Sequence, residues 1–286
     1  MQDVVSLLWL IPVGLVAGAL GTFVGAGGGF LVVPVLLIAY PDFGPETVTA
    51  VSLAIIFLNS TSGSVRYART RRIDYQSGLM FAFATMPGAV VGAYLSDMIP
   101  RAFFNLAFGL FMLAVSVLLI AKPGSTKSAS GGTRPGRYHR RFTDAKGETW
   151  DYSFSRGTGV GISTVVGLLS SVLGIGGGII HVPVMSRLLN FPVHIATATS
   201  QFILAITSLT GVTVHLVRGE YFSAEVLTCL VLLAAGVIPG AQIGARLSEK
   251  VDSRWILRIL GVVIIVVAVR LFVSAAPSLV STLGGR

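Results

Sequence analysis

The chain has 286 residues, of which 53% are hydrophobic and only 12% are charged, and its mean hydropathy is +0.82. This composition lies far outside that of soluble globular domains and indicates a membrane protein. The formal net charge is +9, but the basic residues cluster in loops beside apolar segments, where membrane topology explains them, so nucleic-acid binding is not expected. The one cysteine, Cys229, excludes an intrachain disulfide and a thiolate metal cluster.

Apolar segments of about 20 residues recur along the chain, and each is long enough as a helix to cross roughly 30 Å of hydrocarbon. They cover residues 4–24, 47–65, 78–95, 103–121, 195–217, 224–243 and 257–275. Two shorter apolar segments, 28–40 and 177–190, would rise only about 20 Å and are expected to be half-helices. We therefore predict an all-α polytopic membrane protein with about eight full spans plus short broken or re-entrant helices.

A motif of three consecutive glycines followed by a proline occurs twice, at 27–34 and at 176–183, with an offset of 149 residues. Pro-Gly-Ala also occurs twice, at 87–89 and 239–241, with an offset of 152. Such self-similarity predicts an internal duplication. The expected units are a first transmembrane repeat (1–121), a connector (122–156), a second repeat (157–276) and a C-terminal tail (277–286). Each repeat has about five segments, and an odd number inverts the second copy in the membrane.

The positive charges give the expected orientation. If the connector is cytoplasmic, 17 of the 21 Lys and Arg residues lie on the cytoplasmic side, as the positive-inside rule requires. The chain is then a multi-pass protein of the cell inner membrane with both termini extracytoplasmic. The connector is basic and rich in Gly, Ser and Thr, so we expect a mobile cytoplasmic linker. Its run 137–142 is expected to act as a topology determinant and tether, and contact with anionic lipid headgroups is the alternative.

Glycine runs in a lipid-facing helix are costly, because they lose backbone entropy and expose peptide groups. Broken backbone is tolerated where it is buried or lines a cavity, and a half-helix that follows it directs free N–H groups and a positive dipole end at an anion. We therefore expect a substrate site near the membrane midplane. Its backbone residues would be Gly27, Gly28, Gly29, Gly176, Gly177 and Gly178. The alternative is that the glycines only allow close helix packing.

A helix rich in hydroxyl and amide side chains follows each glycine run. Such side chains replace water around an oxyanion without adding charge. Ser52 and Ser200 occupy equivalent places at an offset of 148 and are expected to bind the substrate, together with Asn59 and Gln201. The alternative for each is a hydrogen bond to its own helix or to a neighbouring one.

His181 lies three residues after the second glycine run, where the first half has Val32. An ionisable residue at membrane depth is costly, and an imidazole beside an anion site can couple transport to protons. His181 is therefore the coupling candidate, with a structural histidine at a helix interface as the alternative. The chain has no His-Glu-x-x-His, Gly-x-Ser-x-Gly or Walker sequence, so no enzyme, cofactor or metal is expected.

The two motifs at 25–34 and 174–183, each followed by a Ser/Thr-rich helix, resemble the sulfite exporter TauE/SafE family of membrane transporters (TSUP) over nearly the whole chain. The resemblance implies a helical bundle and a cargo of sulfite, a sulfonate or another organosulfur anion. The basic connector carries no motif of that family.

These features predict a secondary transporter that exports a small sulfur-containing anion by alternating access. The alternatives are a passive anion channel, an uptake carrier for thiosulfate or an organic anion, and a membrane-embedded enzyme that uses His181 or Cys229. The expected partners are the anionic substrate and the lipid bilayer, and assembly as a homodimer stays open.

Overall fold

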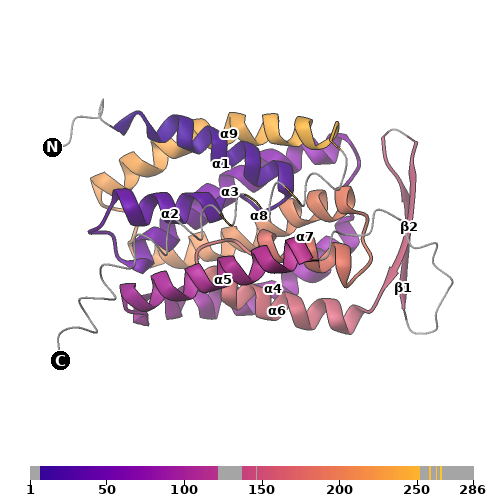
Figure 1. The fold of residues 1–286 in the computed structure, drawn as a ribbon, viewed down its shortest axis with the longest axis horizontal. Helices are drawn as coiled ribbons and strands as arrows, with labels where there is room; N and C mark the ends of the chain where they lie inside the picture. Colours follow the sequence, from indigo (N-terminus) through magenta and orange to yellow (C-terminus); the bar gives the residue numbers. More distant parts are fainter. Residues whose placement is uncertain are drawn as a thin grey trace.

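The structure is a computed structural model that describes residues 7–121, 137–145 and 147–251, together with residues 258, 262 and 265. Within these residues the chain forms nine α-helices and one two-stranded hairpin (Figure 1). The prediction of a mostly helical fold is confirmed. The remainder of the predicted span 257–275, the tail 277–286 and residues 122–136 of the connector lie outside the described residues.

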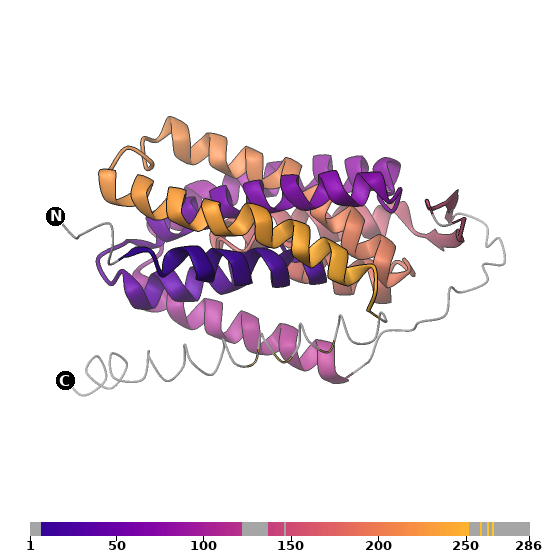
Figure 2. The ribbon, with the colours of Figure 1, turned by 90° about the horizontal axis from the view of Figure 1, so that it is seen from above.

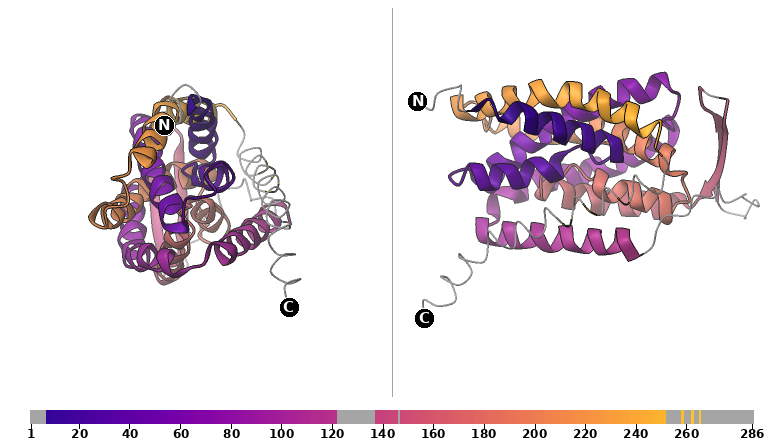
Figure 3. Two further views of the ribbon diagram at one scale, coloured as in Figure 1. Left: turned by 90° about the vertical axis from the view of Figure 1, so that its left-hand side faces the viewer. Right: turned by 45° about the horizontal axis from the view of Figure 1, so that its top comes forward.

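The helices lie roughly side by side along the long axis of the molecule (Figure 2), and Figure 3 shows the same bundle from one end. Four of them, α3, α4, α8 and α9, are long and apolar enough to cross a membrane. In chain order the helices are α1 (Leu10–Val24), α2 (Gly29–Ala39), α3 (Pro45–Arg69), α4 (Tyr75–Leu95), the 3-10 helix η2 (Ser96–Met98), α5 (Arg101–Ala121), α6 (Arg156–Val172), α7 (Gly178–Arg187), α8 (Val193–Val217) and α9 (Ala224–Ser248).

Helices α2 and α7 are short, with 11 and 10 residues, which confirms the two predicted half-helices. Each begins after a glycine in the left-handed backbone region, Gly28 at φ 83° and Gly177 at φ 79°. Gly25, which ends α1, is also left-handed. Glycine adopts this region without the steric cost that other residues pay. The glycines therefore interrupt the helical structure at two places. Residues 25–28 are called the first glycine loop, and residues 174–177 are called the second glycine loop.

Small residues bring helix backbones close together in two places. A Cβ built on Gly14 of α1 would lie 2.3 Å from the carbonyl oxygen of Leu233 on α9, and one built on Gly88 of α4 would lie 2.4 Å from that of Thr164 on α6. No side chain fits at these distances, so the helices pack backbone to backbone, as small-residue motifs allow in membranes. The duplicated Pro-Gly-Ala motifs at 87–89 and 239–241 belong to these two contacts.

Residues 137–156 correct two expectations, an all-helical chain and a connector without structure. Strands β1 (Tyr138–Thr143) and β2 (Thr149–Phe154) form an antiparallel hairpin at one end of the bundle (Figure 1). The second strand reads Thr-Trp-Asp-Tyr-Ser-Phe, and its aromatic and β-branched residues suit a strand that is buried on one face. Because the connector is polar overall, its composition did not predict this short strand.

Aromatic side chains pack the hairpin against the bundle. The rings of Tyr152 and Phe154 lie 4.4 Å and 5.1 Å from that of Phe191, centroid to centroid, and Phe154 also contacts Phe81 on α4 at 5.7 Å. All four side chains are buried. Burial of such rings, with their tilted contacts, stabilises the docked hairpin.

Asp74, the N-cap of α4, ties the hairpin to the helices. Its carboxylate accepts hydrogen bonds from Arg140 Nη2 and Tyr152 Oη, each at 2.6 Å, and from Ser77. Burial disfavours the charged carboxylate, but these hydrogen bonds and the charge of Arg140 outweigh it and hold the pKa of Asp74 below its usual range. Among the residues of the alternative lipid contact at 137–142, the charge of Arg140 is paired with Asp74.

Candidate anion-binding site

The two glycine loops meet inside the bundle. A Cβ built on Gly178 would lie 2.5 Å from the carbonyl oxygen of Gly25, and one built on Gly29 would lie 2.9 Å from that of Gly174. These distances leave no room for a side chain at either position. The structure thus brings together the two glycine runs that lie 149 residues apart in the sequence.

Two serines tie the loops across this contact. Ser52 on α3 donates from Oγ to the carbonyl oxygen of Gly174 at 2.6 Å, and Ser200 on α8 donates to that of Gly25 at 2.8 Å. Both serines are fully buried. The structure therefore places the two predicted serines beside the loops, with their hydroxyl hydrogens directed at backbone carbonyls.

The first N–H groups of each half-helix are not used. Within the described chain, the backbone N–H groups of residues 28–30 and 177–179 donate no hydrogen bond to another residue. First-turn N–H groups carry the positive end of the helix dipole and are the groups with which a helix start binds an anion. The starts of α2 and α7 therefore both lie beside the contact between the two glycine loops.

Hydrophobic side chains close the space beside both loops. A Cβ built on Gly27 would lie 2.9 Å from carbons of both Ile56 and Leu204, and one built on Gly176 would lie 2.8 Å from Ile56 Cγ2. With Leu53, these two side chains form a small buried cluster. The site is therefore closed in this structure, and an anion reaches the free N–H groups only when the packing around them changes.

Uncharged polar side chains border the first glycine loop. The predicted residues Asn59 and Gln201 lie here together with Thr22 and Ser60, and all four are fully buried. Thr22 Oγ1 donates to Asn59 Oδ1 at 3.0 Å, and Gln201 Nε2 donates to the carbonyl oxygen of Gly21 at 3.0 Å. Thr22, Asn59, Ser60 and Gln201 are referred to below as the polar cluster.

Gly63 on α3 shows how close the members of the cluster lie. A Cβ built on Gly63 would lie 3.1 Å from Thr22 Oγ1 and 3.6 Å from Gln201 Oε1. Ser60 Oγ would lie 3.5 Å from a Cβ built on Gly27, so the cluster extends to the first glycine loop. A side chain at either glycine would occupy the space that these polar groups share.

Three atoms of the polar cluster have no hydrogen-bond partner within the described part of the chain: Asn59 Nδ2, Ser60 Oγ and Gln201 Oε1. An unsatisfied buried polar group costs roughly 1–3 kcal/mol. Because most buried polar atoms in proteins are satisfied, three unpartnered atoms within one cluster indicate a place for a polar ligand or for water.

Thr22 and Ser60 were not singled out from the sequence. Thr22 lies in an apolar segment and resembles an ordinary residue of a span, and Ser60 is one of several hydroxyl residues in a row. The position of Thr22 in the last turn before the first glycine loop was the available signal.

His181 lies on α7 one turn after the second glycine loop and is buried. Neither ring nitrogen has a hydrogen-bond partner among the described residues, and the backbone N–H of His181 donates to the carbonyl oxygen of Gly177 at 2.9 Å. In the same part of the chain, no three His, Cys, Asp or Glu side chains gather as metal ligands.

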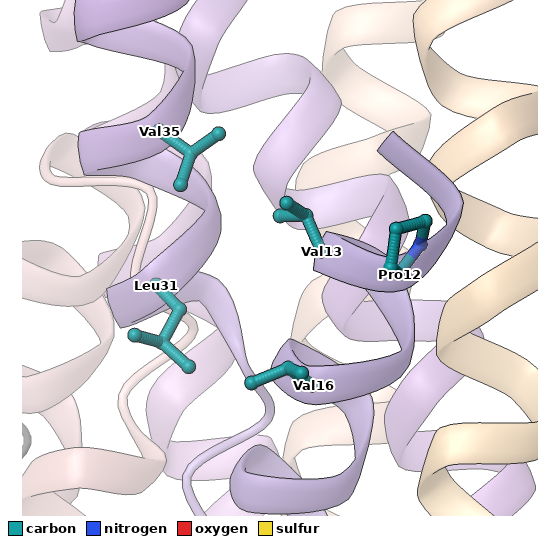
Figure 4. Close-up of a pocket in the computed structure, with 5 residues that line it drawn as sticks. All are labelled: Pro12, Val13, Val16, Leu31 and Val35. Atoms are coloured by element: carbon teal, nitrogen blue, oxygen red, sulfur yellow. The ribbon is translucent and has the colours of Figure 1, made fainter. Parts of the chain in front are cut away.

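A pocket of about 340 Å³ lies between α1 and α2 (Figure 4). It is lined by Pro12, Val13, Val16, Leu31 and Val35. These side chains offer no hydrogen-bond donor to an anion, and none of them belongs to the candidate site. The pocket is therefore separate from that site.

The chain matches the family described as sulfite exporter TauE/SafE over residues 10–271. It is 33% identical over 274 residues to the probable membrane transporter protein YunE of Bacillus subtilis, covering 93% of this chain and 97% of that protein. It is also 24% identical over 255 residues to the probable membrane transporter protein MJ0441 of Methanocaldococcus jannaschii, covering 86% and 87%. No solved structure matches it significantly. The chain therefore belongs to the TauE/SafE family and is a multi-pass membrane transporter, not an enzyme.

Proposed function

We propose that the protein is a secondary transporter that exports a small sulfur-containing anion, such as sulfite or a sulfonate. The observation that carries this proposal is the meeting of two half-helix starts with unused N–H groups at 28–30 and 177–179. Two positive dipole ends at one buried place favour a negative charge there, as in other transporters with discontinuous helices. The sulfur chemistry of the cargo rests on the family to which the chain belongs.

Two inverted repeats, 1–121 and 157–276, account for the packing. Helix α1 packs against α9 and α4 against α6, while α3 and α8 pack against each other. If α6–α9 repeat α1–α4, the first helix of each repeat packs on the fourth helix of the other, and the third helices pair. The exchanged hydrogen bonds of Ser52 and Ser200 follow the same two-fold pattern.

Alternating access follows from relative rocking of the repeats. Rocking separates the two glycine loops, breaks the ties of Ser52 and Ser200 to the loop carbonyls, and frees the N–H groups for the anion. The serine hydroxyls then donate to the substrate instead. Asn59 and Gln201 supply further uncharged contacts from the polar cluster.

In the proposed orientation, the hairpin and the rest of the connector lie on the cytoplasmic side of the inner membrane, and both termini lie on the extracytoplasmic side. His181 is the proposed coupling residue, because its imidazole is an ionisable group that can bind and release a proton and it lies one turn after the second glycine loop. The mechanism applies equally to a monomer and to a homodimer.

The first test is thermal stabilisation of the purified protein by sulfite, thiosulfate, sulfoacetate, taurine, sulfate and simple carboxylates, since a ligand that binds only the folded state raises the melting temperature.

The second test is sulfite flux in proteoliposomes. Gly28→Val and Gly177→Val are expected to insert normally and to lose transport. Gly161→Val on α6 is the matched control, because a Cβ there meets nothing within 4 Å.

Normal transport by both loop variants would contradict the glycine site. Stabilisation by carboxylates alone would contradict the sulfur cargo and leave the anion site in place. Flux that neither saturates nor accumulates substrate against a gradient would show a channel instead of a carrier.

A further inference from the structure

We infer that the polar cluster selects a monovalent anion that carries its own hydrogen-bond donor, an O–H or an N–H, beside its acidic group. The inference rests on the proposed function and concerns the ligand class of the same site. It follows from which atoms of the cluster are free and from how little positive charge the site offers.

The free atoms of the cluster have defined roles. Asn59 Oδ1 already accepts from Thr22, and Gln201 Nε2 already donates to a backbone carbonyl. Asn59 therefore presents its NH₂ group, and Gln201 presents its carbonyl oxygen. The Asn59 amide and the Ser60 hydroxyl donate to an oxyanion, whereas an amide oxygen only accepts.

The acceptor at Gln201 sets the condition on the ligand. An amide oxygen repels an anion that brings only oxygen lone pairs. A ligand with a hydroxyl or an amino group donates to Gln201 Oε1 while its anionic oxygens accept from Asn59 and Ser60. A site that hydrogen-bonds a substrate group rejects analogues without that group, because its own buried partner is then left unsatisfied.

The charge of the site favours one negative charge over two. All four side chains of the polar cluster are uncharged. Each half-helix start contributes the equivalent of about half a positive charge, so the two together balance about one negative charge. A second negative charge would be buried without a partner, which is strongly unfavourable.

The first half of the chain shows which substitution the fold accepts at this place. At the offset of 148 residues, Leu53 occupies the place of Gln201, and Leu53 packs against Gly211 as Gln201 lies against Gly63. Gln201→Leu therefore removes the acceptor with a residue that occupies the related position on α3.

The experiment compares two sulfonates of equal charge and similar size. 2-Hydroxyethanesulfonate carries a hydroxyl group where 1-propanesulfonate carries a methyl group. Titration calorimetry of the full chain in detergent, in competition with sulfite, measures both affinities. The wild type is expected to bind the hydroxyl compound about tenfold more tightly, which corresponds to about one net hydrogen bond.

Three variants separate the roles of the side chains. Gln201→Leu is expected to lose the tenfold preference. Gln242→Leu, the same chemical change on α9 where Gln242 bonds Ser62, is the control and is expected to keep it. Ser60→Ala is expected to weaken both sulfonates equally, since its hydroxyl faces their common acidic group.

Equal binding of the two sulfonates by the wild type would overturn the inference and leave the proposed function standing. A preference that survives in Gln201→Leu would also overturn it, because the acceptor would then lie elsewhere. If no anion binds, sulfite included, the proposed function fails and the inference fails with it. If Gln201→Leu does not fold, the wild-type comparison and Ser60→Ala still decide the question.

Discussion

The first and second glycine loops share a backbone design but differ in their surroundings. Both have left-handed glycines, unused N–H groups and a serine tie from the opposite half. Beside the first loop lies the polar cluster with three unpartnered atoms. At the places related by the repeat, Thr207 and Ser208 on α8 donate to carbonyl oxygens of their own helix, and Leu53 on α3 stands in place of Gln201.

This difference separates two contributions to an anion site. The backbone of the loops supplies dipole ends, and it does so in both halves. Among the described residues, the polar cluster beside the first loop has three unpartnered side-chain atoms, whereas beside the second loop Thr49 Oγ1 and the ring nitrogens of His181 are unpartnered. We therefore expect a substrate held between the two dipole ends to be discriminated by the polar cluster beside the first loop.

The largest effect is expected from a methyl group at the contact of the loops. Gly178→Ala places a Cβ 2.5 Å from the carbonyl oxygen of Gly25, and Gly29→Ala places one 2.9 Å from that of Gly174. Neither Gly29 nor Gly178 has a positive φ, so these variants test the close contact rather than backbone strain. We expect both to abolish sulfite flux, whereas Gly161→Ala keeps it. Full activity in either loop variant would show that the loops need not touch.

The next effect concerns the tie between the hairpin and the first loop. Asp74 N–H donates to Thr199 Oγ1, next to the serine that holds Gly25. Arg140→Ala leaves the buried carboxylate of Asp74 without its charged partner, and a buried charge that loses its partner is destabilising. We expect the hairpin to undock, as measured by hydrogen exchange of the strand amides, and the protection of the first loop to fall more than that of the second.

The same tie predicts a dependence of docking on pH. Because the pKa of Asp74 is lower in the docked state than in an unfolded chain, its contribution is complete above the ordinary carboxyl pKa and is lost as the pH falls through the lowered value. Trp150 packs beside the hairpin core and reports docking by its fluorescence once Trp9 and Trp255 are replaced by phenylalanine. Asp74→Asn is expected to remove this acid transition; a transition that persists would assign it to another group.

A smaller effect is expected inside the polar cluster. Asn59→Leu removes a donor and leaves the Thr22 hydroxyl without its acceptor, at a cost of roughly 1–3 kcal/mol. We expect sulfite affinity to fall about tenfold or more, because about 1.4 kcal/mol corresponds to tenfold. Thr207→Val, at the related place on α8, is the matched variant and should leave affinity nearly unchanged. Equal losses in both would contradict a one-sided site.

The smallest effect is expected from the serine ties. Ser52→Ala and Ser200→Ala each remove one buried hydrogen bond to a loop carbonyl, at about 1 kcal/mol of stability each. Denaturation of the purified variants should therefore give nearly equal losses, in contrast to the unequal pair in the cluster. A large difference between the two serines would show that the ties are not equivalent.

The hairpin shows where composition misled the prediction. The connector is polar overall, but Tyr152 and Phe154 alternate into a core made by α4 and by the residues before α8. A six-residue strand is stabilised by the surface on which it docks, and that surface is formed by residues distant in sequence. Local composition therefore could not predict it.

The sequence predicted which polar residues follow the glycine runs, but not the contacts that these residues make. Ser52, Ser200, Asn59 and Gln201 were named because hydroxyls and amides follow the glycine runs, and the structure places them beside the loops. Their partners are carbonyl and hydroxyl groups of the opposite half or of a neighbouring helix. No periodicity in the sequence specifies such partners.

By itself, the sequence determined that the protein lies in a membrane, that it has two short half-helices, and that these half-helices follow glycines. Apolar length, backbone freedom and repetition are local properties, and they can be read without knowing what each segment touches. Only the tertiary structure decided that the two loops touch, that Gln201 and Asn59 lie beside the first loop, and that part of the connector is a docked hairpin. These features depend on contacts between distant segments, since a buried polar atom is satisfied or left free only by what packs against it.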